Sequence, residues 1–175
     1  MKNRILAGVN AVAVIIISLG TLSSTAFCQE NHTDAHAGHE SSDFELGVAI
    51  GYAYLEEEKE NGVNLHLHVM KRLSGEGIQK YLSVGFGLET IFTEEEHYGA
   101  MVTLGIHPWR NLVFAISPGW EWVKHEGEWE SGYATHLEAA YTFEGSGFHY
   151  GPVVGYSKTQ HDQHYTIGIH FGFPF

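Results

Sequence analysis

The segment 165–175 alternates strictly between two kinds of side chain. Every second residue from Tyr165 to Phe175 is apolar or aromatic, and the residues between them are Thr, Gly, His, Gly and Pro. Successive side chains of a β-strand point to opposite faces, so a period of two predicts a strand with one apolar face and one small or polar face. A chain made of such strands must cover a continuous apolar surface with either a core or lipid.

Seven earlier segments repeat this alternation, and no stretch between them has a helical period. With the last one, the expected strands are 44–54, 63–73, 80–92, 98–106, 112–123, 133–143, 148–157 and 165–175. An even number of strands suits a closed single-chain barrel. Lengths near ten residues suit tilted strands that cross a membrane.

Glycine favours a barrel whose apolar face points outward. Eight glycines share the face opposite the apolar residues: Gly47, Gly51, Gly85, Gly87, Gly151, Gly155, Gly168 and Gly172. Small residues on that face allow a narrow barrel to close around a polar lumen. A soluble sandwich or lipocalin-like barrel would turn the apolar face inward. We therefore predict an all-β fold over residues 44–175, an eight-stranded antiparallel up-and-down transmembrane β-barrel.

The segment 1–28 has the anatomy of a secretory signal peptide. Lys2 and Arg4 precede an apolar stretch, and small residues follow it up to Ala26. Cleavage after Ala26 or after Cys28 both fit, and Cys28 also allows lipidation. Residues 29–43 are polar and contain three histidines, which predicts a disordered His-rich N-terminal arm.

The charge of the chain excludes one class of partner. All 21 acidic residues follow the predicted signal peptide, whereas two of the nine basic residues lie within it. Such an acidic chain repels nucleic acid and attracts cations. Acidic connections are expected at one end of the barrel (56–62, 93–97, 124–131 and 158–163), and short turns at the other (74–77, 108–111 and 144–147).

With this strand pattern and a C-terminal Phe175, the chain resembles the small eight-stranded outer-membrane barrels of the OmpX and OmpA-barrel type. The resemblance covers about 44–175. It implies the outer membrane of a Gram-negative bacterium, lipid around the barrel, and an assembly machinery that reads the strand ending at Phe175. Members of this group act as adhesins, anchors, enzymes and small binders, so the resemblance does not define one function.

Parity predicts which titratable side chains point into the lumen. The candidates are His66, His68, Glu89, Glu121, His136, Glu138 and His170. An eight-stranded lumen is about wide enough for its own side chains, so these groups are expected to meet. Imidazole and carboxylate together suit zinc, nickel or copper. The alternative is a polar network in which histidines satisfy buried carboxylates. A lower set, Glu45, His107 and His149, is expected to pack beside the turns.

We expect a structural or surface-interaction role for this barrel. The alternative is a barrel that binds or handles a divalent metal. A lipid-modifying enzyme is a weaker alternative, because the strand residues Ser83, Ser117 and Ser157 point inward by parity, away from lipid.

Overall fold

The structure, a computed structural model, describes residues 43–125, 127–160 and 162–175. The predicted signal peptide and all but the last residue of the predicted arm lie outside the described residues. The strands are β1 (Phe44–Leu55), β2 (Glu60–Arg72), β3 (Leu82–Phe92), β4 (Glu96–Trp109), β5 (Leu112–His125), β6 (Glu128–Tyr141), β7 (Phe143–Glu144), β8 (His149–Thr159) and β9 (Gln163–Pro174). A short 3-10 turn, η1 (Gln79–Tyr81), precedes β3.

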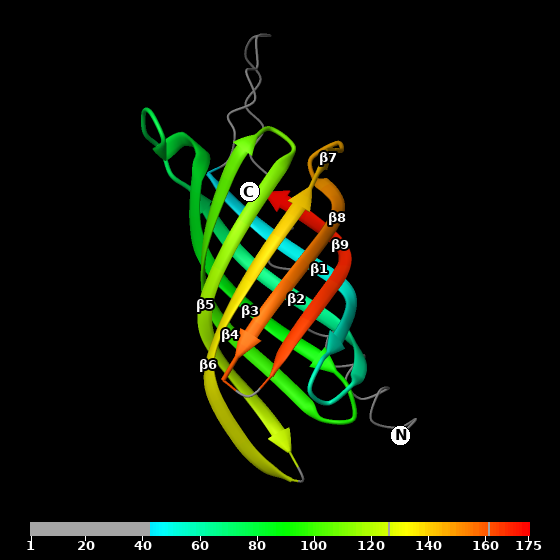
Figure 1. The fold of residues 1–175 in the computed structure, drawn as a ribbon. Helices are drawn as coiled ribbons and strands as arrows, with labels where there is room; N and C mark the ends of the chain where they lie inside the picture. Colours follow the sequence, from blue (N-terminus) through cyan, green and yellow to red (C-terminus); the bar gives the residue numbers. More distant parts are fainter. Residues whose placement is uncertain (1–42, 126, 161) are drawn as a thin grey trace, which may run out of the picture. The chain divides into compact units, whose positions relative to one another are not determined.

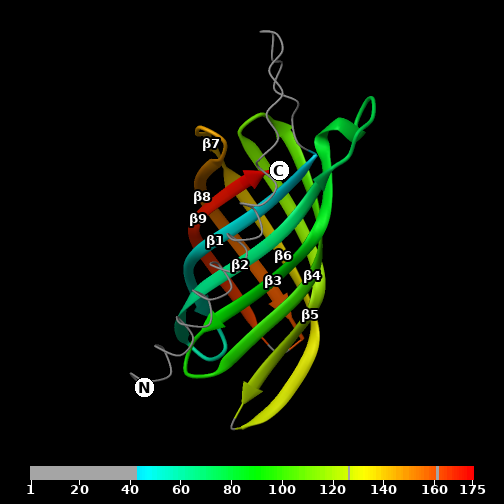
Figure 2. The same ribbon diagram turned by 180° about the vertical axis from the view of Figure 1, so that it is seen from behind.

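The strands form one closed antiparallel sheet, seen from two sides in Figures 1 and 2. Their order is β6-β5-β4-β3-β2-β1-β9-β8-β7, and a further pairing of β6 with β8 closes the ring. β7 continues the line of β6 after Thr142 and pairs with the start of β8. Because β6 and β7 together occupy one position in the sheet, the barrel is eight-stranded, and the predicted fold class is confirmed.

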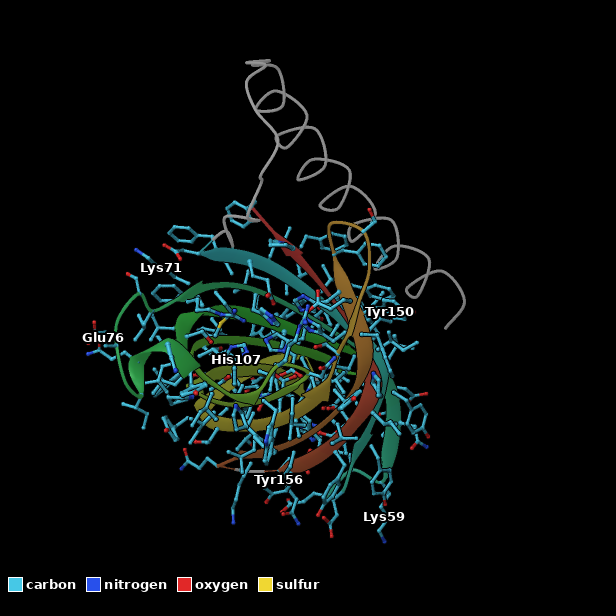
Figure 3. All side chains as sticks on the ribbon, turned by 90° about the horizontal axis from the view of Figure 1, so that it is seen from above. Lys59, Lys71, Glu76, His107, Tyr150 and Tyr156 are labelled. Atoms are coloured by element: carbon cyan, nitrogen blue, oxygen red, sulfur yellow. The ribbon has the colours of Figure 1, made fainter. Side chains whose placement is uncertain are left out.

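The apolar faces of the strands point out of the barrel. Phe86 is 72% exposed, and Leu88 and Ile167 are each 61% exposed. In the view along the barrel in Figure 3, the labelled His107 lies inside the ring of strands, whereas Tyr156 lies outside it. The side chains that fill the interior are small or polar, as the glycine pattern predicts. In the part of the chain that the structure describes, no helix is long and apolar enough to cross a membrane.

The connections differ in length from the expected arrangement of acidic connections at one end and short turns at the other. The acidic connections 56–59 and 93–95 are tight hairpins, whereas the connection 73–81 at the opposite end is longer. The strands continue past the last apolar residues because ladder hydrogen bonds do not need apolar side chains. β5 and β6 continue to His125 and Glu128, and Gly127 turns between them with φ of 95°.

The charge asymmetry between the two ends remains although the loops are short. One end, which we call the acidic mouth, carries the carboxylates of Glu56, Glu57, Glu58, Glu60, Glu94, Glu95, Glu96, Glu128, Glu130 and Asp162. Three lysines, Lys59, Lys124 and Lys158, lie among them, so acids outnumber bases there. The end that holds the first residue of β1 and the last of β9 carries Lys71, Arg72, Lys80 and Arg110 beside fewer acids. Any positively charged species is therefore attracted to the acidic mouth.

Candidate functional site: a histidine–glutamate lumen

The histidines and glutamates of the lumen form several groups along the barrel, not one cluster of seven. Five of the seven predicted residues are buried at 9% exposure or less, namely His66, Glu89, Glu121, His136 and His170. His68 and Glu138 are partly buried and contact other lumen side chains.

The central group joins Glu89 of β3 to His136 of β6 and His164 of β9. His136 Nδ1 lies 3.1 Å from Glu89 Oε2, and His164 Nε2 lies 4.0 Å from Glu89 Oε1. One nitrogen of each imidazole and one carboxylate oxygen lie within 4.8 Å of one another, and all three residues are buried. We call Glu89, His136 and His164 the central trio.

Two neighbours orient the central trio. Asn64 Nδ2 donates a hydrogen bond to Glu89 Oε1. Ser157 Oγ lies 3.1 Å from His136 Nε2, and the register places Ser157 between His136 and His164 on neighbouring strands. His164 Nε2 is buried and has no hydrogen-bond partner among the described residues. This nitrogen is available to a ligand.

A second contact crosses the lumen from β2 to β6. His66 Nδ1 lies 3.2 Å from Glu138 Oε1, and His66 Nε2 is buried without a hydrogen-bond partner in the described part of the chain. Glycine makes room for this ring, because a Cβ at Gly87 would lie 2.6 Å from His66 Nε2. A Cβ at Gly47 would overlap the ring of His68. These glycines thus allow imidazoles to fill a narrow lumen.

A third group lies toward the end of the barrel that carries the chain termini. Glu45 Oε1 is 3.5 Å from His149 Nε2 and 3.8 Å from His170 Nε2. The His170 ring stacks on those of His68 and His149, with centroids 5.2 and 5.4 Å apart. His170 therefore joins Glu45 and His149 of the expected lower set, whereas His107 Nε2 contacts Ser83 Oγ at 3.0 Å.

A fourth group lies at the acidic mouth, where His97 sits between two carboxylates. Its Nδ1 is 3.7 Å from Glu121 Oε1, and its Nε2 is 3.7 Å from Glu58 Oε2. The imidazole of His97 lowers the pKa of the Glu58 carboxyl, an effect that outweighs the rise caused by partial burial. The Glu58 carboxylate is therefore kept in the charged form that attracts cations.

Sequence reasoning missed His97 and His164. His97 falls in the expected connection 93–97, and His164 falls between the expected connection 158–163 and the expected strand 165–175. The strands are longer at the acidic mouth than expected, and both histidines lie inside strands. The available signal was parity, because His97 continues the inward series of Gly99 and Met101, and His164 that of Thr166 and Gly168.

The positive partners in the lumen are imidazoles. Of the ion pairs among the described residues, those formed by Lys or Arg are Arg110–Glu144 and Lys124–Glu96, both at barrel ends. An imidazole can lose its proton and offer a lone pair to a metal, which Arg and Lys in their usual charged forms cannot do. The lumen therefore contains side chains of the types that can ligate a transition metal, and not only fixed charge pairs.

The contacts Ser157–His136–Glu89 also have the order of a serine–histidine–acid relay. However, Ser157 is 1% exposed and points into the packed lumen. A lipid substrate outside the barrel does not reach this hydroxyl. The arrangement instead fixes the orientation of the His136 ring.

The fold and the lumen together define the class of small eight-stranded barrels with a polar interior. No protein-family model and no curated protein sequence matches the chain. Among solved structures, the chain is similar to Neisserial surface protein A, with a TM-score of 0.56, 9% identity, and coverage of 78% of this chain and 100% of that chain.

Two further structures have lower TM-scores. A de novo designed transmembrane β-barrel has a TM-score of 0.49, 14% identity, and coverage of 77% of this chain and 98% of its own. The Yersinia pestis outer membrane protein Ail has a TM-score of 0.47, 13% identity, and coverage of 75% of this chain and 99% of its own. At 9% identity, the match to Neisserial surface protein A shows the fold alone, which is that of a small eight-stranded outer-membrane barrel.

Proposed function

We propose that this protein is an integral barrel of a Gram-negative outer membrane whose lumen binds one divalent transition-metal ion at the central trio. The membrane assignment is supported by the continuous apolar outer wall. Contact of so many exposed Leu, Ile, Val and aromatic side chains with water would be unfavourable, whereas contact with the hydrocarbon of a membrane would not. A filled eight-stranded lumen leaves no wide channel, so a bound ion is favoured over a pore.

The observation that carries the metal proposal is the convergence of Glu89, His136 and His164 at one point in the lumen. Two imidazole nitrogens and one carboxylate oxygen are a common donor set for zinc, and also suit nickel and copper. The donor atoms lie within 4.8 Å of one another, so small side-chain rotations bring them onto one ion. A metal would also occupy His164 Nε2, which has no hydrogen-bond partner among the described residues.

The neighbours of the trio suit a metal ligand as well. If His136 Nε2 carries the ring proton and donates a hydrogen bond to Ser157 Oγ, Nδ1 has a free lone pair on the side of Glu89. Metal-bound histidines commonly donate their second N–H in this way, which fixes the tautomer and the ring orientation. Asn64 holds the Glu89 carboxylate from its other side. A bound ion would act as a Lewis acid, and Ser157 and Asn64 position its ligands His136 and Glu89.

The test is the metal content of the purified full chain. His32, His36 and His39 are replaced by Asn in every sample, and the protein carries an affinity tag without histidine, so that neither binds the metal. The unmodified trio is compared with His136→Asn/His164→Asn. The control is Ser117→Ala, which removes a lumen hydroxyl whose partner is Thr103, 2.9 Å away. Heat-modifiable gel mobility checks that each barrel is folded.

We expect about one zinc, nickel or copper ion that survives dialysis against a weak chelator in the parent and the control. The double variant should lose it. Equal metal content in the double variant and the control would overturn the proposal, as would a metal-free parent after loading with zinc. The lumen would then be a polar network, and the structural or surface-interaction role would replace the metal role.

A further inference from the structure

The acidic mouth contains a pocket that the central trio does not use. The pocket has a volume of about 320 Å³ and lies between the hairpins of the mouth. Its lining includes Glu57, Glu58, Glu95, His97 and Glu121. A pocket in which several carboxylates surround the imidazoles of His97 and His125 differs from a solvated charged surface, because its polar atoms converge.

Three of these residues form a compact donor set. One ligand atom from each of Glu58, Glu95 and His97 lies within 4.8 Å of the others. Glu58 comes from the β1–β2 turn, and Glu95 and His97 come from the β3–β4 hairpin, so two hairpins of the barrel meet here. The first-row divalent ions accept mixed imidazole and carboxylate ligands.

Two atoms of this set are buried and have no hydrogen-bond partner among the described residues, which points to a ligand. His97 is 3% exposed, and its Nε2 has no hydrogen-bond partner among the described residues. The same holds for Glu95 Oε2. The other oxygen of Glu95 is held by His125 Nδ1 at 2.6 Å, so the carboxylate is fixed while its second oxygen stays available. Buried polar atoms are seldom left without a partner.

Two carboxylates also fix the orientation of the His97 ring. Its Nδ1 faces Glu121, which is 7% exposed, and its Nε2 faces Glu58. When the ring is neutral and its Nδ1 carries the proton on the side of Glu121, Nε2 offers its lone pair to an ion beside Glu58, as in metal-bound histidines whose other nitrogen donates to a carboxylate. The mouth thus has three ligands and a residue that positions one of them.

We propose that Glu58, Glu95 and His97 form a second, solvent-accessible site for a first-row divalent transition-metal ion, distinct from the central trio. This inference goes beyond the lumenal site and does not depend on it, because the two sites share no ligand. The surrounding carboxylates concentrate cations at the mouth. Since the pocket opens to solvent, its ion exchanges with the medium faster than an ion enclosed in the lumen.

The experiment is a Zn²⁺ titration of the full chain with an absorbing chelator as competitor. It is performed with the arm histidines replaced and with His136→Asn/His164→Asn removing the central trio. The variants are Glu95→Gln and His97→Asn, and the matched control is Glu94→Gln. Glu94 is an exposed carboxylate of the same hairpin outside the pocket, and its loss changes the charge of the mouth by the same amount as Glu95→Gln.

We expect Glu95→Gln and His97→Asn each to weaken Zn²⁺ binding at least about tenfold, as loss of a ligand or its partner does. Glu94→Gln should stay close to the parent. Co²⁺ should give an absorption spectrum of a protein-ligated ion in the parent and not in His97→Asn. If His97→Asn does not fold, Glu95→Gln against Glu94→Gln still decides.

Equal weakening by Glu95→Gln and Glu94→Gln, abolished at high salt, would overturn the proposal, because it would show diffuse attraction to acidic residues. Absence of Zn²⁺ binding in the parent would do the same. Binding at the mouth together with a metal-free central trio would support this site and reject the lumenal one, so the two proposals fail separately.

Discussion

The outer wall and the lumen of this barrel come from the same strands, but they obey different rules. On the wall, side chains such as Leu88 and Ile167 are exposed, and their apolar character is what matters. In the lumen, Glu89, His136 and Glu138 make individual contacts across the barrel with distances near 3 Å. A wall residue can be replaced by another apolar residue, whereas a lumen residue depends on a particular partner.

The largest expected effect concerns the wall. Leu88→Lys should lower the free energy of unfolding from lipid vesicles by about 2–4 kcal/mol, because a charged side chain is driven into hydrocarbon. Denaturant titration in vesicles measures it. The matched control is Val63→Lys, which lies nearer the acidic mouth and is 52% exposed. It should change stability by about 0–1 kcal/mol, the usual value near the membrane surface.

Equal and negligible effects of both lysines would show that the wall faces water. The exposed apolar residues of the wall would then form a surface for contact with another protein and not with lipid.

The next effect concerns the lumen. Glu138→Ala removes the partner of His66 Nδ1, and His66 is 2% exposed with its Nε2 already unpartnered. A buried polar group without partners lowers stability by about 1–3 kcal/mol. The same vesicle titration measures it, with Glu144→Ala as the control. Glu144 pairs with Arg110 where both side chains are more than half exposed, so its loss should be nearly silent. Similar losses of stability at both positions would mean that the His66–Glu138 contact stabilises the barrel no more than an exposed ion pair does.

The smallest expected effect is on affinity rather than on folding. Ser157→Ala removes the hydroxyl 3.1 Å from His136 Nε2 and leaves the central trio intact. Zinc should dissociate at least about tenfold more easily, as when an outer-shell partner is lost. Chelator competition on the chain with Glu95→Gln isolates the lumenal ion. Ser117→Ala is again the control, and equal affinity in the two serine variants would show that Ser157 does not position His136.

The sequence predicts the wall well because parity alone determines it. Each strand needs only an alternating pattern, and the fold class and nearly all strand positions follow from that pattern. The exceptions lie at strand ends. The third strand begins at Leu82 and not at Lys80, since 79–81 form a 3-10 turn, and the strands at the acidic mouth run further than their apolar residues.

The groupings in the lumen could not be predicted in the same way. Parity says that Glu89 and His136 point inward, but which side chains meet depends on how the strands are staggered when the barrel closes. That stagger follows from the register of pairs such as β6 with β8 and from the irregularity between Ile106 and Trp109, which no local pattern encodes. His97 and His164 were missed because apolar alternation, which marked the strand ends, stops before the hydrogen-bonded ladder does.

The most direct test of the account is zinc X-ray absorption spectroscopy on the full chain, loaded with less than one zinc per chain, with the arm histidines replaced and with Glu95→Gln weakening the mouth site. The account predicts a zinc ion with only nitrogen and oxygen neighbours at about 2.0–2.2 Å. It also predicts outer scattering from two imidazoles, which His136→Asn/His164→Asn abolishes. A spectrum without imidazole scattering, or one that the double variant leaves unchanged, would contradict a metal site at Glu89, His136 and His164.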